Sequence, residues 1–412
     1  MKEMKAIAIF EDQELKVTND LIKNSNANFL LIRCEQYGKF NGKYNYEEFQ
    51  NVTIVTIDAF LPPELSAEFI NKNCKNKNIQ LITSINLSEK CQYLAQRLFH
   101  FLGLNSFTNE VSLISKDKIQ MKKYMRNIGL KTVDFAEVYS AEEVEYTLGK
   151  WSKSGVLKPR NSDSCREIII IERNSNFEFL RSLDYSKGWI LEQKLDLTKV
   201  SEFAVDVSFS KGSLDSIFVT EYPSPLLTTI GGRNINGNIS IDIDDLIFRD
   251  ELIESIKIFF RGLKVDNLIM HLEIFFNQNE IIFSEVGFRL GGSGIITNHE
   301  QAFNLPYYKI LQKVLQLDET PYNQRHVKYI GELLLPLSQE GKITTIKGLD
   351  RIVGYTNVIS CELYYIEGDV IQINNNSFES FGRVILSAEN SVEIRSTMKC
   401  ILENFEYQVE VK

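Results

Sequence analysis

Short apolar runs alternate with longer polar stretches over the first hundred residues. The runs cover residues 5–10, 28–34, 52–57 and 79–83. Strands buried in a parallel sheet are continuous apolar runs of this kind, and the connections between them are usually helical. A helix is predicted from Ser88, with apolar residues at three-to-four spacing up to Leu102 and Gly103 in the place of a left-handed C-cap. The pattern predicts an open, Rossmann-like α/β domain that ends near residue 108.

The pattern changes class after residue 115. Helices are predicted over 116–128, 141–153, 251–263, 299–316 and 392–404. Strands are predicted over 155–157, 165–171, 189–193, 203–209, 215–221, 268–276 and 281–285, and near 327–336, 359–366 and 382–387. Lys211-Gly212 is expected to form the turn of an antiparallel hairpin. The chain therefore combines α/β with α+β structure.

Composition narrows the class of function. The 412 residues are 43% hydrophobic and 25% charged, which is typical of globular protein and excludes collagen-like and disordered chains. A formal charge of −9 argues against nucleic acid as a partner. No apolar run is long enough to span a bilayer, so we expect no membrane partner and a cytoplasmic location. The six cysteines show no CxxC spacing and are expected to be reduced thiols.

The most informative stretch runs from Met270 to Gly292. If residues 278–280 form a three-residue turn, Glu273 lies opposite Glu285, and His271 lies opposite Gly287. Like charges paired across strands destabilise a sheet, so two carboxylates about 5 Å apart require a cation. Oxygen ligands of this kind suit Mg²⁺ completed by water and phosphate oxygens. The alternative is a register that differs by one residue, with both acids merely solvated.

Two lysines and a polar loop precede this hairpin. Lys158 ends the apolar strand GVLKP, and Lys118 opens a helix, so each could neutralise a phosphate. A single lysine is more often only a surface charge. The loop 160–166 has short polar side chains and would suit a mobile flap, but it contains no glycine and is not a Walker A sequence. A simple surface turn explains that loop equally well.

Several motifs occur together in a fixed order. They are Asp117-Lys118, VLKP at 156–159, LEQ at 191–193, SEFAVDV at 201–207, HLE at 271–273, EVGFRLGG at 285–292 and GRVILSAENSVEI at 382–394. With these motifs the chain resembles the ATP-grasp superfamily. The similarity is greatest to its carboxylate–amine ligase branch, which includes the L-amino acid ligases and is related in layout to biotin carboxylase.

The resemblance implies a domain plan and a nucleotide site. The plan is an N-terminal domain over 1–108, an ATP-grasp small lobe over 109–195, a large lobe over 196–325 and a C-terminal subdomain over 326–412. Lys118 and Lys158 would hold the ATP phosphates. Glu192 and Gln193 would begin the hinge that reads adenine through its backbone, and Glu202 would bind the ribose hydroxyls.

The resemblance also implies the reacting groups. Glu273 and Glu285 would be the magnesium ligands, and Arg289 would contact the substrate carboxylate or its acyl phosphate. The chain departs from the family where Gly287 replaces an asparagine that is often a third metal ligand. It departs again in the glycine-free flap, where the side chains of Arg160 or Arg166 would have to take the place of backbone amides. His271 has two interpretations, a group near the nucleotide or metal and a satisfied core histidine.

The implied activity is an ATP- and Mg²⁺-dependent ligase. It would activate a carboxylate, in this interpretation that of an amino acid, as an acyl phosphate, join it to an amine, and release ADP and phosphate. Two alternatives remain open: an ATP-grasp ligase that loads an amino acid onto a carrier-protein thiol, and a nucleotide-binding protein without turnover. The expected partners are small-molecule carboxylate and amine substrates, with a carrier protein for the first alternative and a homodimer as the assembly. The sequence identifies neither substrate.

Overall fold

The N-terminal part of the chain is a four-stranded parallel sheet. The computed structural model describes all residues except 1–2, 35, 37, 39, 41, 105–106, 162–166, 173–176, 230–233, 278, 293, 374–378 and 411–412. The sheet contains β1 (Met4–Glu11), β2 (Asn28–Cys34), β3 (Val52–Ile57) and β4 (Ile79–Asn86), in the order β3-β2-β1-β4. The four apolar runs thus form the parallel strands that the sequence predicted.

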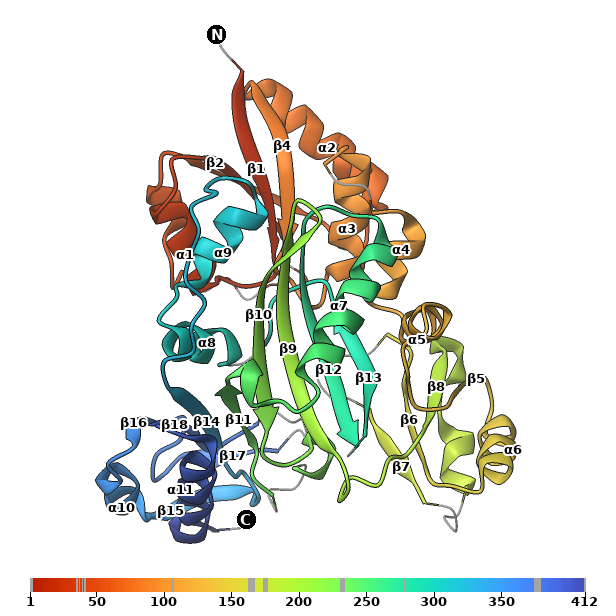
Figure 1. The fold of residues 1–412 in the computed structure, drawn as a ribbon, viewed down its shortest axis with the longest axis vertical. Helices are drawn as coiled ribbons and strands as arrows, with labels where there is room; N and C mark the ends of the chain where they lie inside the picture. The colour runs from red at the N-terminus through yellow and green to blue at the C-terminus, as the bar shows by residue number, and fades with distance from the viewer. Residues whose placement is uncertain are drawn as a thin grey trace.

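Helices cover both faces of this sheet (Figure 1). The helices are α1 (Lys16–Lys23) and α9 (Tyr307–Val314) on one face, and α2 (Pro63–Asn76) and α3 (Gln92–Phe101) on the other. Alternate residues of β1 supply the two cores: Ile7 and Ile9 pack toward α1 and α9, whereas Ala6 and Ala8 pack toward α2 and α3. Because α9 comes from much later in the chain, the N-terminal sheet acquires its full core only when that later segment folds against it.

A second, antiparallel sheet forms the small lobe. It has the order β5-β8-β6-β7, from β5 (Phe135–Val138), β6 (Gly155–Pro159), β7 (Ile169–Ile171) and β8 (Trp189–Gln193). In the chain, helices α4 (Asn109–Ile114) and α5 (Lys118–Asn127) precede this sheet, and α6 (Ala141–Trp151) connects β5 to β6. A core of its own includes Val144, Leu157 and Leu191. The lobe projects from the side of the molecule (Figure 1).

An eight-stranded sheet forms the centre of the molecule. Its order is β13-β12-β9-β10-β11-β14-β18-β16. The strands are β9 (Ser201–Ser210), β10 (Ser213–Tyr222), β11 (Gly237–Ile241), β12 (Leu268–Asn277), β13 (Glu280–Gly287), β14 (Tyr329–Leu335), β16 (Val358–Leu363) and β18 (Gly382–Ala388). Helix α7 (Arg249–Leu263) packs on one face. The division expected at 325/326 therefore falls between strands of one continuous sheet.

The C-terminal region adds a smaller sheet that the sequence patterns did not indicate. It contains β15 (Gly341–Lys347), β17 (Val370–Ile371) and β19 (Glu406–Glu410), in the order β17-β15-β19. Helices α10 (Leu349–Gly354) and α11 (Ser391–Asn404) pack against each other and against β14, β16 and β18 of the eight-stranded sheet. The short strands β15 and β19 have polar residues at alternate positions and few apolar ones, so neither forms an apolar run that would predict a strand. The expected final helix and the strand at 382–388 are both present.

The helix predicted over 299–316 is wrong as a single element. Two helices occur instead, α8 (Ile295–Phe303) and α9, separated by Asn304 in the left-handed region with φ of 47°. Pro306 stands immediately before α9. Proline lacks the N–H that a continuous helix needs and restricts the residue before it, although the apolar periodicity runs on across the break. The break sends α8 toward the central sheet and α9 toward the N-terminal sheet.

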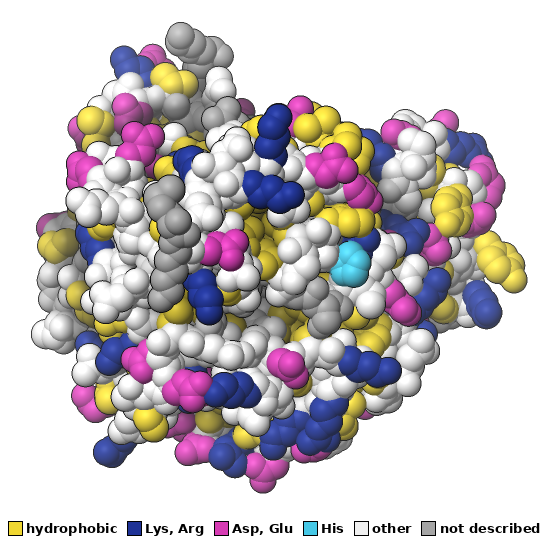
Figure 2. Space-filling view, turned by 90° about the horizontal axis from the view of Figure 1, so that it is seen from above, with side chains coloured by type: hydrophobic (Ala, Val, Ile, Leu, Met, Phe, Trp, Pro, Cys, Tyr) yellow, Lys and Arg dark blue, Asp and Glu magenta, His cyan; other side chains and the backbone are white. Residues whose placement is uncertain are grey.

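Charge is mixed on the surface around the N-terminal end. Figure 2 shows basic and acidic side chains spread over this face together with scattered hydrophobic ones. Among the described helices, none has the length and apolarity needed to cross a membrane.

One buried acid lies at the end of β1. The Glu11 side chain is fully buried, and its carboxylate accepts a hydrogen bond from Arg33 Nη2 at 3.1 Å. Burial nevertheless raises the pKa of Glu11 from 4.5 to about 7, with Arg33 opposing the shift. The folded protein therefore binds a proton at this site that the unfolded chain has already lost between pH 4.5 and 7. In that window the folded state loses stability as the pH rises.

We predict that Glu11→Gln removes this pH dependence. The wild-type free energy of unfolding should fall by about 3 kcal/mol between pH 4.5 and 7 through this group, since each pKa unit is worth about 1.4 kcal/mol. The variant should lack that fall. Midpoints of thermal unfolding of wild type and Glu11→Gln, measured at pH 5 and pH 7.5, test the prediction. If the midpoints of the two proteins differ by the same amount at both pH values, the prediction is wrong.

Candidate active site

The hairpin of β12 and β13 has the register that the sequence predicted at its functional end. Glu273 pairs with Glu285, and His271 pairs with Gly287. The route to this register differs from the expectation, because Asn277 pairs with Glu280 and the turn is one residue shorter. A bulge at Ser284 supplies the missing residue and restores the pairing. Two differences from the expected hairpin thus cancel before the site is reached.

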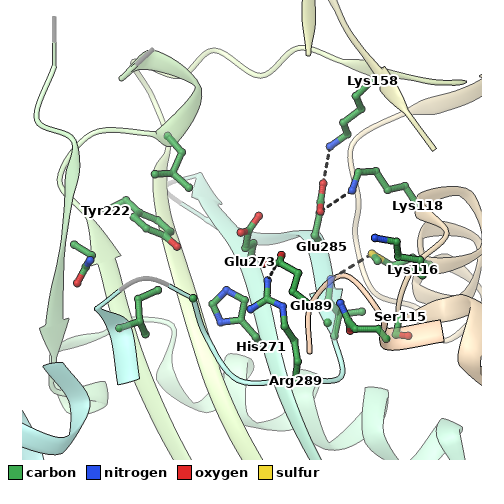
Figure 3. Close-up of a pocket in the computed structure, with 18 of the residues that line it drawn as sticks. Glu89, Ser115, Lys116, Lys118, Lys158, Tyr222, His271, Glu273, Glu285 and Arg289 are labelled. Carbon is green, nitrogen blue, oxygen red and sulfur yellow. Dashed lines mark hydrogen bonds and ion pairs between the residues drawn. The ribbon is translucent and has the colours of Figure 1, made fainter. Parts of the chain in front are cut away.

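Two ammonium groups bind the Glu285 carboxylate (Figure 3). Lys118 Nζ lies 2.9 Å from Oε2, and Lys158 Nζ lies 2.9 Å from Oε1. Lys118 is the first residue of α5, directly after Asp117, whose side chain caps that helix, and Lys158 lies in β6. Burial acts to raise the pKa of Glu285, but the two lysines hold it well below its usual range. The small lobe is therefore tied to the central sheet at this carboxylate.

A third lysine extends this pair into a chain of alternating charges. Lys122 Nζ and Lys158 Nζ each lie 3.2 Å from an oxygen of Glu192, and Lys122 also donates to the Ser284 carbonyl at 3.0 Å. Lys122 is fully buried. Burial acts to raise the pKa of Glu192, yet Lys122 and then Lys158 lower it. Sequence reasoning missed Lys122, although its place one helical turn after Lys118 puts both on the same face of α5.

Glu273 differs from its neighbour across the hairpin. No hydrogen bond or ion pair joins its carboxylate to another described residue. Burial, and next the Glu285 carboxylate, raise its pKa. Among the described residues no group of three His, Cys, Asp or Glu side chains could hold a metal. The two glutamates therefore offer part of a cation site, which phosphate oxygens and water would have to complete.

Arg289 is held in place by the end of the N-terminal sheet. Its Nη2 donates to Glu89 at 2.7 Å and its Nη1 to the Leu290 carbonyl at 2.5 Å, whereas its buried Nε has no hydrogen-bond partner among the described residues. The backbone of Phe288, one residue earlier, donates to Gln92 at 2.7 Å. The guanidinium therefore keeps one free donor beside the Glu89 pair.

Gly287 leaves room for that guanidinium. A Cβ at this position would lie 3.3 Å from Arg289 Nε and 3.2 Å from Gln92 Oε1. An asparagine side chain extending further would crowd the arginine. A side chain at residue 287 would therefore require Arg289 or Gln92 to shift by a few tenths of an ångström.

His271 contacts both the site and the core. Its Nδ1 lies 3.1 Å from Asp206 Oδ1, and the same oxygen accepts the Gly291 N–H at 2.8 Å. A Cβ on Gly291 would come within 2.9 Å of that carboxylate oxygen, so only glycine fits there. Asp206 thus joins strand β12 to the glycine-containing loop after β13. The ring of His271 is buried and also lines the cavity described next, and its place near a nucleotide or metal stays a prediction.

These groups surround one cavity, called here the main cavity, with a volume of about 140 Å³. Figure 3 shows the charged side chains converging on it from the central sheet, α5 and β6. Its lining includes Glu89, Lys116, Lys118, Lys158, Tyr222, Leu226, His271, Glu273, Glu285, Arg289 and Gly292. Five residues named from the sequence, Lys118, Lys158, Glu273, Glu285 and Arg289, therefore meet in one place.

Other predicted site residues lie apart from this lining. Glu202 is buried and accepts the Leu226 N–H at 2.7 Å, and burial followed by the Glu273 charge raises its pKa to about 8. Gln193 ends β8, where its backbone N–H donates to Asp134. The side chain of Glu192 faces the lysines described above. The adenine and ribose contacts assigned to Glu192, Gln193 and Glu202 stay predictions.

Of the two arginines predicted in the flap, the structure describes Arg160 and not Arg166. Arg160 Nε donates to Asp117 at 2.6 Å, its Nη1 pairs with Glu137, and it does not line the main cavity. Arg160 therefore braces the start of α5 in this structure, and its contact with a phosphate stays a prediction. Arg166 lies outside the described residues.

Known proteins similar to this chain are ligases and synthetases. No protein-family profile matches it. An L-arginine-specific L-amino acid ligase from Bacillus subtilis is 21% identical over 328 residues, which cover 78% of each chain. The crystal structure of an L-amino acid ligase from Bacillus licheniformis matches with a TM-score of 0.73 at 17% identity and full coverage of both chains. An ADP complex of N5-carboxyaminoimidazole ribonucleotide synthetase matches with a TM-score of 0.66 at 14% identity and 98% coverage of both.

The two structural matches show the fold. They extend over all or nearly all of this chain, including the N-terminal parallel sheet and the C-terminal region. The fold that the resemblance to the ATP-grasp superfamily implied, a Rossmann-like domain combined with a two-lobed fold, is confirmed.

We predict that Lys122→Met destabilises the protein while Lys123→Met does not. The first substitution leaves the buried Glu192 with one of its two cations, and breaking a buried ion pair typically costs about 3–5 kcal/mol. Lys123 is the exposed neighbour on the same helix and serves as the matched control. Thermal unfolding of both variants measures the effect. Equal midpoints for the two variants would show that the charge chain does not stabilise the fold.

We predict that Glu285→Gln weakens the Mg²⁺-dependent part of ATP binding by at least about tenfold, because it removes a charged oxygen ligand. ATP binding without Mg²⁺ should not weaken, since Lys118 and Lys158 lose a competing carboxylate. Calorimetric titration with ATP, with and without Mg²⁺, separates the Mg²⁺-dependent part of ATP binding from the Mg²⁺-independent part. Glu280→Gln, at the exposed far end of the same hairpin, is the control. If ATP binding depends on Mg²⁺ equally in Glu285→Gln and Glu280→Gln, Glu285 is not a magnesium ligand.

Proposed function

We propose that this protein is an ATP-dependent ligase that phosphorylates the carboxylate of an amino acid and joins the resulting acyl group to an amine. One observation carries the proposal. Two lysine ammonium groups bind Glu285, which pairs across the hairpin with Glu273, a residue without a partner among the described residues, and Arg289 lines the same cavity. Acids for a metal ion, cations for phosphates and an arginine for a carboxylate are thus present together. Phosphoryl transfer depends on such positioning and charge neutralisation.

The residues fit Mg²⁺ and ATP. Glu285 already attracts two cations, and Glu273 is a half-buried carboxylate without a partner among the described residues. Mg²⁺ bound by these two glutamates and by phosphate oxygens would neutralise charge on the phosphates. With a cation on the two glutamates, Lys118 and Lys158 would be available to the phosphate oxygens. The same four side chains therefore form a neutral network without ligand and a phosphate site with it.

The proposed chemistry has two steps. A carboxylate oxygen of the first substrate attacks the γ-phosphorus of ATP, and the bond to the β-phosphate oxygen breaks to release ADP. The amine of the second substrate then attacks the acyl carbon, and the C–O bond to phosphate breaks. Arg289 orients the carboxylate, while Lys118 and Lys158 neutralise the transferred phosphoryl group. The amide product, ADP, phosphate and one proton balance the reaction.

The comparisons support an amino acid as the carboxylate substrate. The Bacillus subtilis relative is named as an L-amino acid ligase specific for L-arginine, and the Bacillus licheniformis structure is also an L-amino acid ligase. No observation favours the carrier-protein thiol as acceptor, or loss of turnover, over this interpretation. The homodimer stays a prediction.

An assay of products tests the proposed function. We predict that purified protein releases ADP and phosphate, not AMP and pyrophosphate, when MgATP is supplied with the correct amino acid. Hydroxylamine added in place of the amine should trap the acyl phosphate as a hydroxamate in proportion to ADP. The proposal fails if AMP is the product, or if ADP forms at the same rate without a carboxylate.

A further inference from the structure

A second cavity adjoins the main cavity on the far side of Arg289. Its volume is about 170 Å³. It shares Glu89, Arg289 and Gly292 with the main cavity, so the Arg289–Glu89 ion pair lies between the two spaces. We call it the side cavity. Any ligand whose carboxylate lies on Arg289 can extend into it.

The side cavity lies where an open parallel sheet typically binds a ligand. Its lining includes Gln13 and Leu15, which follow β1, and Leu87 and Glu89, which follow β4. In the order β3-β2-β1-β4, β2 and β3 are added on one side of β1, whereas β4 is added on its other side, so the strand order reverses between β1 and β4. Ligands of such sheets bind outside the carboxyl ends of the strands at this switch point. The N-terminal domain therefore contributes its expected binding edge to this space.

The Arg289–Glu89 pair matches the head group of a free amino acid. A carboxylate can bind Arg289 through Nε, which has no partner among the described residues, and through Nη2, which now donates to Glu89 at 2.7 Å. Glu89 then loses its cation and can accept a substrate ammonium. One ion pair within the protein would be exchanged for two with the zwitterion, so neither charge is left unpaired.

The lining of the side cavity combines several apolar side chains with the ion pair of Glu300 and Lys16. Leu87 and Leu290 are almost fully buried, and α8 supplies Ile296 and Glu300 at its end of the lining. At that end Glu300 pairs with Lys16 at 3.1 Å, but the side chain of Glu300 is 14% exposed and that of Lys16 is 56% exposed.

The fixed charge at this end is therefore the carboxylate. The Tyr307 N–H donates to Glu300 and holds it in place. Lys16 has a second partner in Asp20 at 2.8 Å, so it can leave Glu300 without losing its only ion pair. A cationic ligand group can consequently replace Lys16 at Glu300.

We propose that the side cavity is the subsite for the side chain of the amino acid that supplies the carboxylate, and that it accepts a long side chain with an apolar stem and a cationic end. The inference rests on the proposed function. Glu89 binds the α-ammonium, Leu87, Leu290 and Ile296 contact the stem, and Glu300 binds the terminal cation. A cavity of about 150 Å³ holds benzene, so about 170 Å³ suits a side chain of about seven non-hydrogen atoms, the size of arginine.

Calorimetric binding tests the subsite independently of turnover. Full-length protein loaded with MgADP is titrated with L-arginine, with its neutral isostere L-citrulline and with L-alanine. Wild type should bind arginine at least about tenfold more tightly than citrulline, because a hydrogen bond between two charged groups is stronger than one to a neutral group. Alanine, which leaves the cavity unfilled, should bind more weakly than both.

Two variants and a control sharpen the test. Glu300→Gln keeps an acceptor for the Tyr307 N–H, and it should remove the preference for arginine over citrulline. Ile296→Trp should fill the cavity and lower the affinity for arginine and citrulline at least about tenfold relative to that for alanine. Glu254→Gln, an exposed acid on α7 away from both cavities, should leave all three affinities unchanged.

The outcomes separate the subsite from the proposed function. Equal affinity for arginine and citrulline in wild type, or a preference that survives Glu300→Gln, overturns the subsite. Unaltered relative affinities in Ile296→Trp overturn it as well. If the protein releases ADP with another carboxylate but binds none of the three amino acids, the subsite fails and the ligase chemistry stands. If arginine binds with the predicted pattern and ADP never forms, the subsite stands and the proposed function fails.

Discussion

The arrangement of the site depends on one half-buried carboxylate that two buried ammonium groups neutralise. Glu285 lies on the central sheet, whereas Lys118 and Lys158 come from the first turn of α5 and from a strand of the small lobe. Charges that are removed from water must be paired closely or the fold loses stability. Lys122 and Glu192 continue the pairing into the small lobe. Electrostatics therefore fixes where the small lobe meets the large one, and the same contact is the place where phosphates would bind.

The substrate side of the site depends on the N-terminal sheet in a different way. Gln92, in the helix that follows β4, accepts a hydrogen bond from the backbone one residue before Arg289, and Glu89 binds the guanidinium itself. Helix α9 in turn covers the face of the N-terminal sheet that Ile7 and Ile9 form. The chain therefore passes between the two regions three times, once before the hairpin and twice after it, on either side of α9. This mutual packing places an arginine from one region and a glutamate from the other within 2.7 Å.

The sequence was most informative where local pattern and chemistry coincide. Alternation along β12 and β13 placed Glu273 opposite Glu285, even though the predicted turn was one residue too long, because a bulge at Ser284 compensated. Apolar periodicity joined α8 and α9 into one helix, and Asn304 and Pro306 were the local signals that opposed it. The inward position of Lys122 could be inferred only by comparing it with Lys118 on the same helix face. The pairing of Arg160 with Asp117 and Glu137 depends on tertiary contacts that no spacing reveals.

The departure at Gly287 follows from the same geometry. The hairpin brings residue 287 beside the guanidinium of Arg289, so a side chain there would compete with the arginine for space. With a side chain at residue 287, Arg289 or Gln92 would have to shift by a few tenths of an ångström. With glycine there, the proposed cation site has one protein ligand fewer than the family pattern implies, and Arg289 keeps an Nε that has no partner among the described residues. Under the proposed function, this arrangement leaves the space beside the glutamates to the arginine that would hold the carboxylate to be phosphorylated.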